Sequence, residues 1–72
     1  MVKVTFKLSD AGTVNLEIDQ PVKFDEVIKR SALMANIELG GFIAVRNGKV
    51  ITTDDIVEQN DEIDVFPAIS GG

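Results

Sequence analysis

The sequence predicts an α+β roll in which one mixed sheet of about five strands packs on one main helix. Three observations support this prediction. Apolar residues alternate with polar ones near both ends of the chain, they follow a helical period between those regions, and the chain is short. Its 72 residues allow one domain at most, because a chain of this length buries only about 60% of its unfolded surface. A deep catalytic cleft is therefore not expected.

The first two strands form a predicted hairpin. Every second residue near the start is apolar, and the members of this set are Val2, Val4, Phe6 and Leu8. Residues 14–18 alternate in the same way, and residues 9–12 between the two runs have the composition of a turn. A period of two is typical of strands with one buried face, so we expect an antiparallel pair here.

A helix is expected over residues 24–35, where the apolar period becomes helical. The predicted buried face consists of Phe24, Val27, Ile28, Ala32 and Ala35. The negative charges of Asp25 and Glu26 are stabilising near the positive, N-terminal end of a helix dipole, so they indicate that the helix begins here. The N-cap would be Lys23, whose side chain cannot accept a hydrogen bond from a helix amide.

Three further strands are expected after the helix. A short apolar run covers residues 42–45, and Asn47-Gly48 then precedes Val50, which is a strong hairpin signal. The last strand is expected at about residues 62–67, while Thr52 to Asp55 can cap one helical turn around residues 56–57. One sheet that covers the apolar helix face would complete a roll of the β-grasp type.

Composition excludes several classes of function. The chain has no Cys and no His, so it lacks a thiolate nucleophile, the commonest general base and the usual zinc and iron–sulfur ligands. The net charge of −5 repels nucleic acid phosphates. The sequence shows neither a signal peptide nor the roughly 18 apolar residues of a membrane span. We expect a cytoplasmic protein with no metal, no bound cofactor, and no direct contact with nucleic acid or membrane.

The sequence divides into an expected β-grasp domain, residues 1–67, and a flexible C-terminal tail, residues 68–72. Pro67 cannot donate a ladder hydrogen bond, so strand pairing should end there. The tail consists of Ala68, Ile69, Ser70, Gly71 and Gly72. At about 3.3 Å per residue it can reach roughly 17 Å from the domain. Gly71 and Gly72 have no Cβ, so they could enter a narrow channel of a partner protein. The alternative interpretation of this glycine pair is a frayed chain end or a cloning remnant.

The stretch from Asn60 to Gly72 resembles the ThiS/MoaD family of ubiquitin-like sulfur carriers, and the resemblance covers nearly the whole chain. Residues 45–50 resemble the central hairpin of that family, although many members lack an Arg at the position of Arg46. Lys23-Phe24 also departs from the Thr-Val of many relatives. The resemblance implies that the chain is a carrier and protein substrate rather than an enzyme, or the small subunit of a synthase complex.

The resemblance also implies partners. A ThiF/MoeB-like adenylating enzyme would use ATP to activate the Gly72 carboxylate, with Gly71 beside it. A sulfur donor such as a cysteine desulfurase would then form a thiocarboxylate, and a synthase or thiolase would take the sulfur for thiamine, molybdopterin or tRNA. One alternative is a ubiquitin-like modifier that is conjugated through Gly72 to target lysines. Another is an interaction module that uses only its surface.

The predicted partner-binding residues surround the start of the tail. Phe66 has the opposite strand parity from Ile63 and Val65, so it should point away from the helix, unless it belongs to the core. If Ile43 and Val45 face the helix, then their neighbours in the strand lie on the open sheet face near Phe66. The alternative is that Phe42 covers Leu39. The full predicted set is Phe66, Pro67, Ala68, Ile69, Ser70, Phe42 and Arg46.

Overall fold

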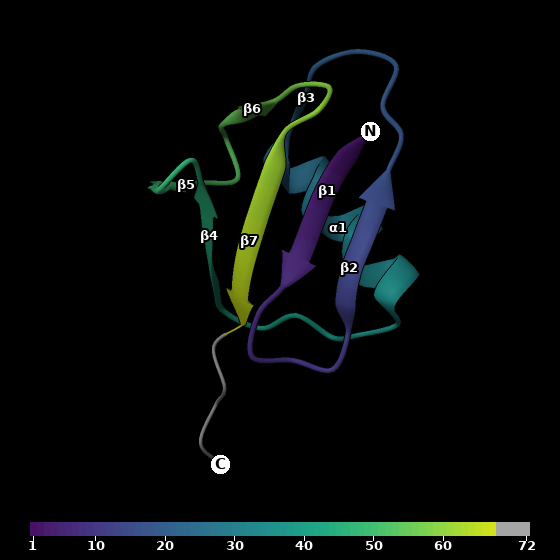
Figure 1. Ribbon diagram of the computed structural model, residues 1–72, viewed down its shortest axis with the longest axis vertical. Coiled ribbons are helices and arrows are strands. Elements are labelled where there is room, and N and C mark those ends of the chain that lie inside the picture. The colour runs from purple at the N-terminus through teal and green to yellow at the C-terminus, as the bar shows by residue number, and fades with distance from the viewer. Residues whose placement is uncertain (68–72) are drawn as a thin grey trace.

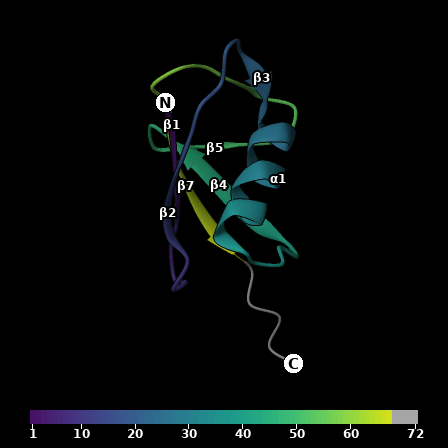
Figure 2. The same cartoon turned by 90° about the vertical axis from the view of Figure 1, so that its right-hand side faces the viewer.

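The computed structural model describes residues 1–67 and has the predicted fold class (Figure 1). In chain order its elements are β1 (Val2–Phe6), β2 (Gly12–Leu16), β3 (Val22–Lys23), α1 (Phe24–Ala35), β4 (Phe42–Arg46), β5 (Lys49–Ile51), β6 (Ile56–Val57) and β7 (Glu62–Pro67). Within this range the main sheet has the order β2-β1-β7-β4-β5, and β3 pairs with β6. Figure 2 shows α1 lying across one face of the sheet. This is the predicted β-grasp arrangement.

Strand β7 lies at the centre of the main sheet. It pairs in parallel with β1 and antiparallel with β4, which makes the sheet mixed. The first strand of the chain therefore lies beside the last one. Because β7 is central, the chain reaches Pro67 between two neighbouring strands rather than at an exposed edge, and Figure 1 shows that the N-terminus lies at the other end of the sheet.

The core fills the space between α1 and the main sheet. Strands β1 and β7 contribute side chains that are at most 2% exposed, namely Val2, Val4, Phe6, Ile63 and Val65. The helix contributes Phe24, Val27 and Ile28, as its periodicity predicts, together with Ser31. The apolar period of the sequence could not identify Ser31 as a core residue, because its side chain is polar. The Ser31 hydroxyl has no hydrogen-bond partner among the described residues.

The helix has the predicted bounds, but its N-terminus is capped from another part of the chain. Lys23 is the N-cap and its side chain makes no capping hydrogen bond. Instead, the amides of Phe24 and Asp25 donate to the carbonyl oxygens of Asp55 and Thr53, at 2.8 and 3.0 Å. These bonds satisfy two amides that the first turn of a helix leaves without partners. The loop before β6 therefore determines where α1 begins.

The predicted helical turn around residues 56–57 is wrong. Ile56 and Val57 form β6, which pairs antiparallel with Lys23 and Val22 of β3. The Asp55 carboxylate accepts a hydrogen bond from the Thr52 amide at 2.6 Å, which closes a turn instead of starting a helix. The physical reason is tertiary, because the carbonyl of Asp55 is directed at the helix start and β6 extends from that point.

Within residues 1–67 no helix has the length and apolar character that crossing a membrane requires. The same residues contain no group of three or more acidic side chains placed to hold a metal ion.

Candidate functional site

The predicted site residues fall into two groups. Phe66 and Pro67 of β7, together with Phe42 and Arg46 of β4, belong to the described part of the chain. Ala68, Ile69, Ser70, Gly71 and Gly72 lie outside the described residues. What the structure describes is therefore the surface from which the tail begins.

Phe66 lies on the open face of the main sheet, opposite the helix. Its neighbour Val65 is fully buried, whereas Phe66 is 36% exposed. Successive side chains of a strand point to opposite faces, so this difference follows from the parity that the sequence predicts. That Phe66 contacts a partner protein stays a prediction.

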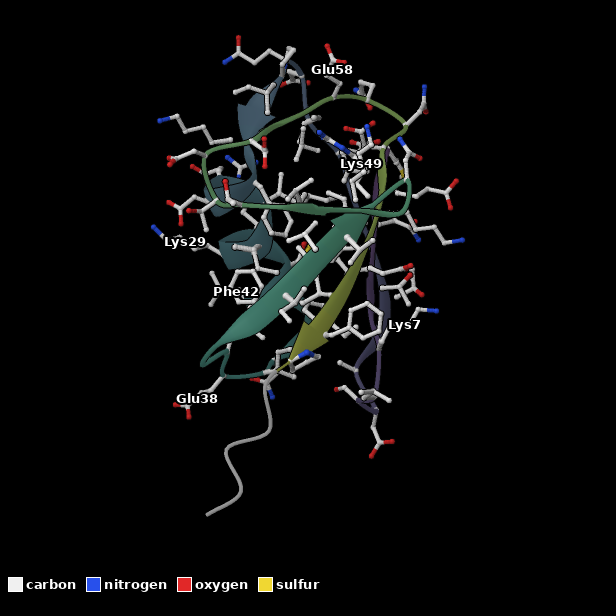
Figure 3. The ribbon with its side chains drawn as sticks, turned by 90° about the vertical axis from the view of Figure 1, so that its left-hand side faces the viewer. Lys7, Lys29, Glu38, Phe42, Lys49 and Glu58 are labelled. Atoms are coloured by element: carbon white, nitrogen blue, oxygen red, sulfur yellow. The ribbon has the colours of Figure 1, made fainter. Side chains whose placement is uncertain are left out.

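Of the two alternatives for β4, the one in which Ile43 and Val45 face the helix is wrong, while Phe42 and Leu39 line the same hollow, as the other alternative expects. Ala44 is 1% exposed, and the ring of Phe42 packs edge-on against the ring of Phe24 with centroids 6.1 Å apart. Ile43 is instead 56% exposed. Figure 3 shows Phe42 on the helix side of β4. Phe42 therefore belongs beside the core and not on the open face near Phe66.

The register between β4 and β7 explains this reversal. Ala44 lies opposite Val65, and Ile43 lies opposite Phe66. Residues directly opposite each other in a sheet point to the same face, so the buried Val65 requires a buried residue at position 44. Residues 42–45 are all apolar, and for that reason the local sequence contains no signal of which face is buried.

Arg46 also lies elsewhere than predicted, although its contact with a partner protein stays a prediction. Its side chain is 24% exposed, and its Nη1 donates to the carbonyl oxygen of Ile56 at 2.7 Å and to Oδ2 of Asp61 at 3.1 Å. The same Asp61 oxygen accepts a hydrogen bond from the Glu58 amide at 2.9 Å. Arg46 therefore ties the end of β4 to the loop that leads into β7, and does not border the open sheet face.

The network around Arg46 leads to a stability prediction. Replacing Arg46 with alanine should lower the free energy of unfolding by about 1.5–3 kcal/mol, because half-buried hydrogen bonds to a charged group are lost. The matched control is Arg30→Ala, since Arg30 pairs with Glu26 at 3.0 Å on the exposed helix surface. That change should cost about 0.5 kcal/mol or less. Urea denaturation measures both values, and equal losses would contradict the assignment.

An apolar patch does cover the open sheet face beside the tail, with different members from those predicted. We call it the sheet patch, and it consists of Ile43, Val45, Val50 and Phe66. Ile43 lies opposite Phe66, and Val45 lies opposite Val50, so the patch is continuous across β7, β4 and β5. Val50 is 69% exposed. Exposed and contiguous apolar side chains of this kind mark interaction surfaces.

Leu8 adds an exposed apolar side chain at the same end of the sheet. The alternation near the start of the chain predicts a buried Leu8, and this is wrong, because the residue is 78% exposed. Its φ of 58° lies in the left-handed region, where the chain leaves β1. The amide of Lys7 still donates to the Val65 carbonyl at 2.8 Å, so Leu8 follows where β1 runs beside the end of β7.

Comparisons with known proteins agree with this geometry. The model of the ThiS family matches residues 6–72 of the chain. The crystal structure of SAMP1 from Haloferax volcanii is similar in fold, with a TM-score of 0.73 over 99% of this chain and 98% of that chain. The two sequences are 19% identical, so this likeness concerns the fold alone. No curated protein sequence matches the chain significantly.

Proposed function

Because the chain belongs to the ThiS family, we propose that it is a sulfur carrier whose working group is the Gly72 carboxylate. The family consists of small ubiquitin-like carriers and modifiers, which act with adenylating enzymes of the E1 type. The observation that carries the proposal is the extent of the family match, which includes β7, Pro67 and the whole tail through Gly72.

The proposed chemistry begins with activation of the carboxylate. A ThiF/MoeB-like partner binds ATP, and the Gly72 carboxylate attacks the α-phosphate and releases pyrophosphate. The terminal sulfur of a cysteine desulfurase persulfide then attacks the acyl carbon and displaces AMP, which gives an acyl disulfide. A thiol reductant cleaves its S–S bond in a two-electron step and leaves the thiocarboxylate on Gly72. Adenylation converts a poor electrophile into an activated acyl group, and the thiocarboxylate that results is a better nucleophile than the carboxylate it replaces.

The contribution of the chain itself is to present this group. Without Cys or His it has no side chain suited to nucleophilic sulfur transfer, so the partner enzymes supply the catalytic groups. The central position of β7 places the start of the tail next to the sheet patch. A partner that receives the tail in a channel would therefore meet Ile43 and Phe66 at the mouth of that channel.

Intact-mass measurement tests the proposal. The purified chain is incubated with ATP, its cognate adenylating enzyme and a sulfur donor, and its mass should rise by about 16 Da as oxygen is replaced by sulfur. Reactions without ATP, or with a chain that lacks Gly72, should show no change. The mass before reaction also establishes whether Gly72 is the last residue of the protein.

Two outcomes would contradict the sulfur-carrier proposal. One is an unchanged mass under conditions that charge another ThiS family member. The other is a Gly-Gly remnant on target lysines in the absence of thiocarboxylate, which would instead identify a protein modifier. The same assay with thiazole, molybdopterin or tRNA-thiolating enzymes as acceptors would identify the recipient of the sulfur.

A further inference from the structure

A second apolar surface lies on the helix side of the molecule, and the proposed activation of the Gly72 carboxylate does not involve it. It is a groove of about 510 Å³ between α1, the segment after it and the start of β4. We call it the helix groove, and its apolar lining is Ile28, Ala32, Leu33, Ile37, Leu39 and Phe42. This volume falls in the range of about 300–1,000 Å³ that is typical of ligand-binding pockets.

The rim of the helix groove exposes an apolar side chain to solvent. Leu33, which lines the groove, is 80% exposed on the outer surface of a helix, where polar residues are usual. The groove is separate from the sheet patch, because Phe42 and Ile43 are adjacent in β4 and point to opposite faces. Both surfaces nevertheless border the start of the tail, since these two residues lie opposite Pro67 and Phe66.

The two ends of the helix groove differ in charge. At one end, Lys29 and Asp25 neutralise each other in an ion pair of 3.0 Å. At the other end, a smaller hollow that includes Leu33 continues to Asn36 and Glu38. None of the ion pairs within residues 1–67 involves Glu38. Figure 3 shows Lys29, Phe42 and Glu38 along the helix side of the molecule.

The helix itself adds negative potential at the Glu38 end. The last turn of α1 contains no basic residue, and the helix ends at Asn36 with a φ of 56°. The carboxyl end of a helix carries a partial charge of about −0.5, at which a nearby cation is stabilising. Here the amides of Asn36 and Ile37 donate to the carbonyl oxygens of Leu33 and Ala32, both at 3.1 Å, and cap part of that end. The groove therefore combines an apolar floor with an acidic end, where Glu38 forms no ion pair with any of residues 1–67.

We propose that the helix groove binds a partner protein through a segment that inserts a large apolar side chain beside Leu33 and places a Lys or Arg next to Glu38. Charge complementarity carries this choice of occupant, since an apolar segment with an acidic flank would be repelled from the same end. The net charge of −5 acts in the same direction. Because the two apolar surfaces face opposite ways, this partner can bind while the sheet patch is occupied.

Nuclear magnetic resonance with two synthetic peptides tests the proposal. Both peptides have twelve residues and carry Leu and Phe on one helical face, and they differ only in having lysines or glutamates on the flanks. The lysine peptide should shift the amide signals of Leu33, Ile37 and Leu39 in the full-length protein. The glutamate peptide should bind at least about tenfold more weakly.

Two variants localise the binding. The Leu33→Glu variant should bind the lysine peptide about tenfold or more weakly than the parent protein does. The thermal unfolding of this variant should be unchanged, because residue 33 is already 80% exposed. Ile43→Glu is the matched control on the opposite face and should bind the lysine peptide as the parent protein does. Neither measurement involves ATP or Gly72, so its result is independent of the sulfur-carrier proposal.

Several outcomes would overturn the proposal. The first is equal affinity of the protein for the two peptides. The second is a lysine peptide that leaves the amide signals of the groove residues Leu33, Ile37 and Leu39 unshifted. The third is an unchanged affinity of the Leu33→Glu variant for the lysine peptide. Groove signals that move with protein concentration alone would identify a second copy as the occupant. Groove signals that move on Ile69→Ser substitution without peptide would identify the tail as the occupant.

Discussion

Replacing Ile43 with glutamate is expected to lower kcat/KM for adenylation of Gly72 by about 100-fold, or close to 3 kcal/mol. Ile43 is exposed and lies directly opposite Phe66, at the point where the chain enters the tail. Under the proposed function, an adenylating enzyme that takes the tail into its active site would cover this surface. A carboxylate buried there without a partner would lose its hydration, so the loss should be seen mainly as a higher KM.

The matched control for this experiment is Ile56→Glu. Ile56 is also an exposed isoleucine in a strand, but β6 pairs with β3 and lies outside the main sheet. Its replacement should leave adenylation within about twofold, and both variants should unfold within about 0.5 kcal/mol of the parent chain. Pyrophosphate release with the cognate enzyme measures the rates. Equal effects of the two substitutions would exclude the sheet patch as the docking surface.

Replacing Phe24 with alanine is expected to lower the free energy of unfolding by roughly 3–5 kcal/mol. Phe24 is fully buried, begins α1 and packs edge-on against Phe42. A domain of this length has a total stability of only about 4–11 kcal/mol, so the variant should lose much of it. The cavity would lie where the helix start, the loop before β6 and β4 come together.

Urea denaturation followed by circular dichroism measures this effect, and Phe66→Ala is its control. The ring of Phe66 lies on the open sheet face and is 36% exposed, so its removal leaves no closed cavity. It should cost less than about 1.5 kcal/mol. If the two phenylalanines contributed equally to stability, the assignment of Phe24 to the core and Phe66 to the surface would be wrong.

Elements specified by local interactions could be predicted from the sequence. The helix bounds, residues 24–35, followed from apolar periodicity and from acidic residues in the first turn, and they are confirmed. The hairpin at Asn47-Gly48 is also confirmed, and both residues have positive φ, of 53° and 77°. A two-residue turn of this kind requires left-handed conformations that Asn and Gly adopt readily.

Elements specified by strand register could not be predicted in the same way. The run from Phe42 to Val45 is entirely apolar, so either face could be buried, and pairing with β7 selects the face of Ala44. Arg46 could not be assigned either, because its partners Ile56 and Asp61 are 10 and 15 residues away in the chain. The alternation that ends at Leu8 gave no sign of the left-handed turn there.

The sequence by itself predicted the β-grasp fold, because periodicity is a local property of the chain, and its resemblance to the ThiS/MoaD family implied the proposed chemistry. Only the tertiary structure decided which side chains surround the start of the tail. The face to which a side chain in a sheet points depends on the register with the neighbouring strand, and 15 residues of intervening chain separate β4 from β7. That register put Ile43 beside Phe66 and placed Phe42 in the helix groove.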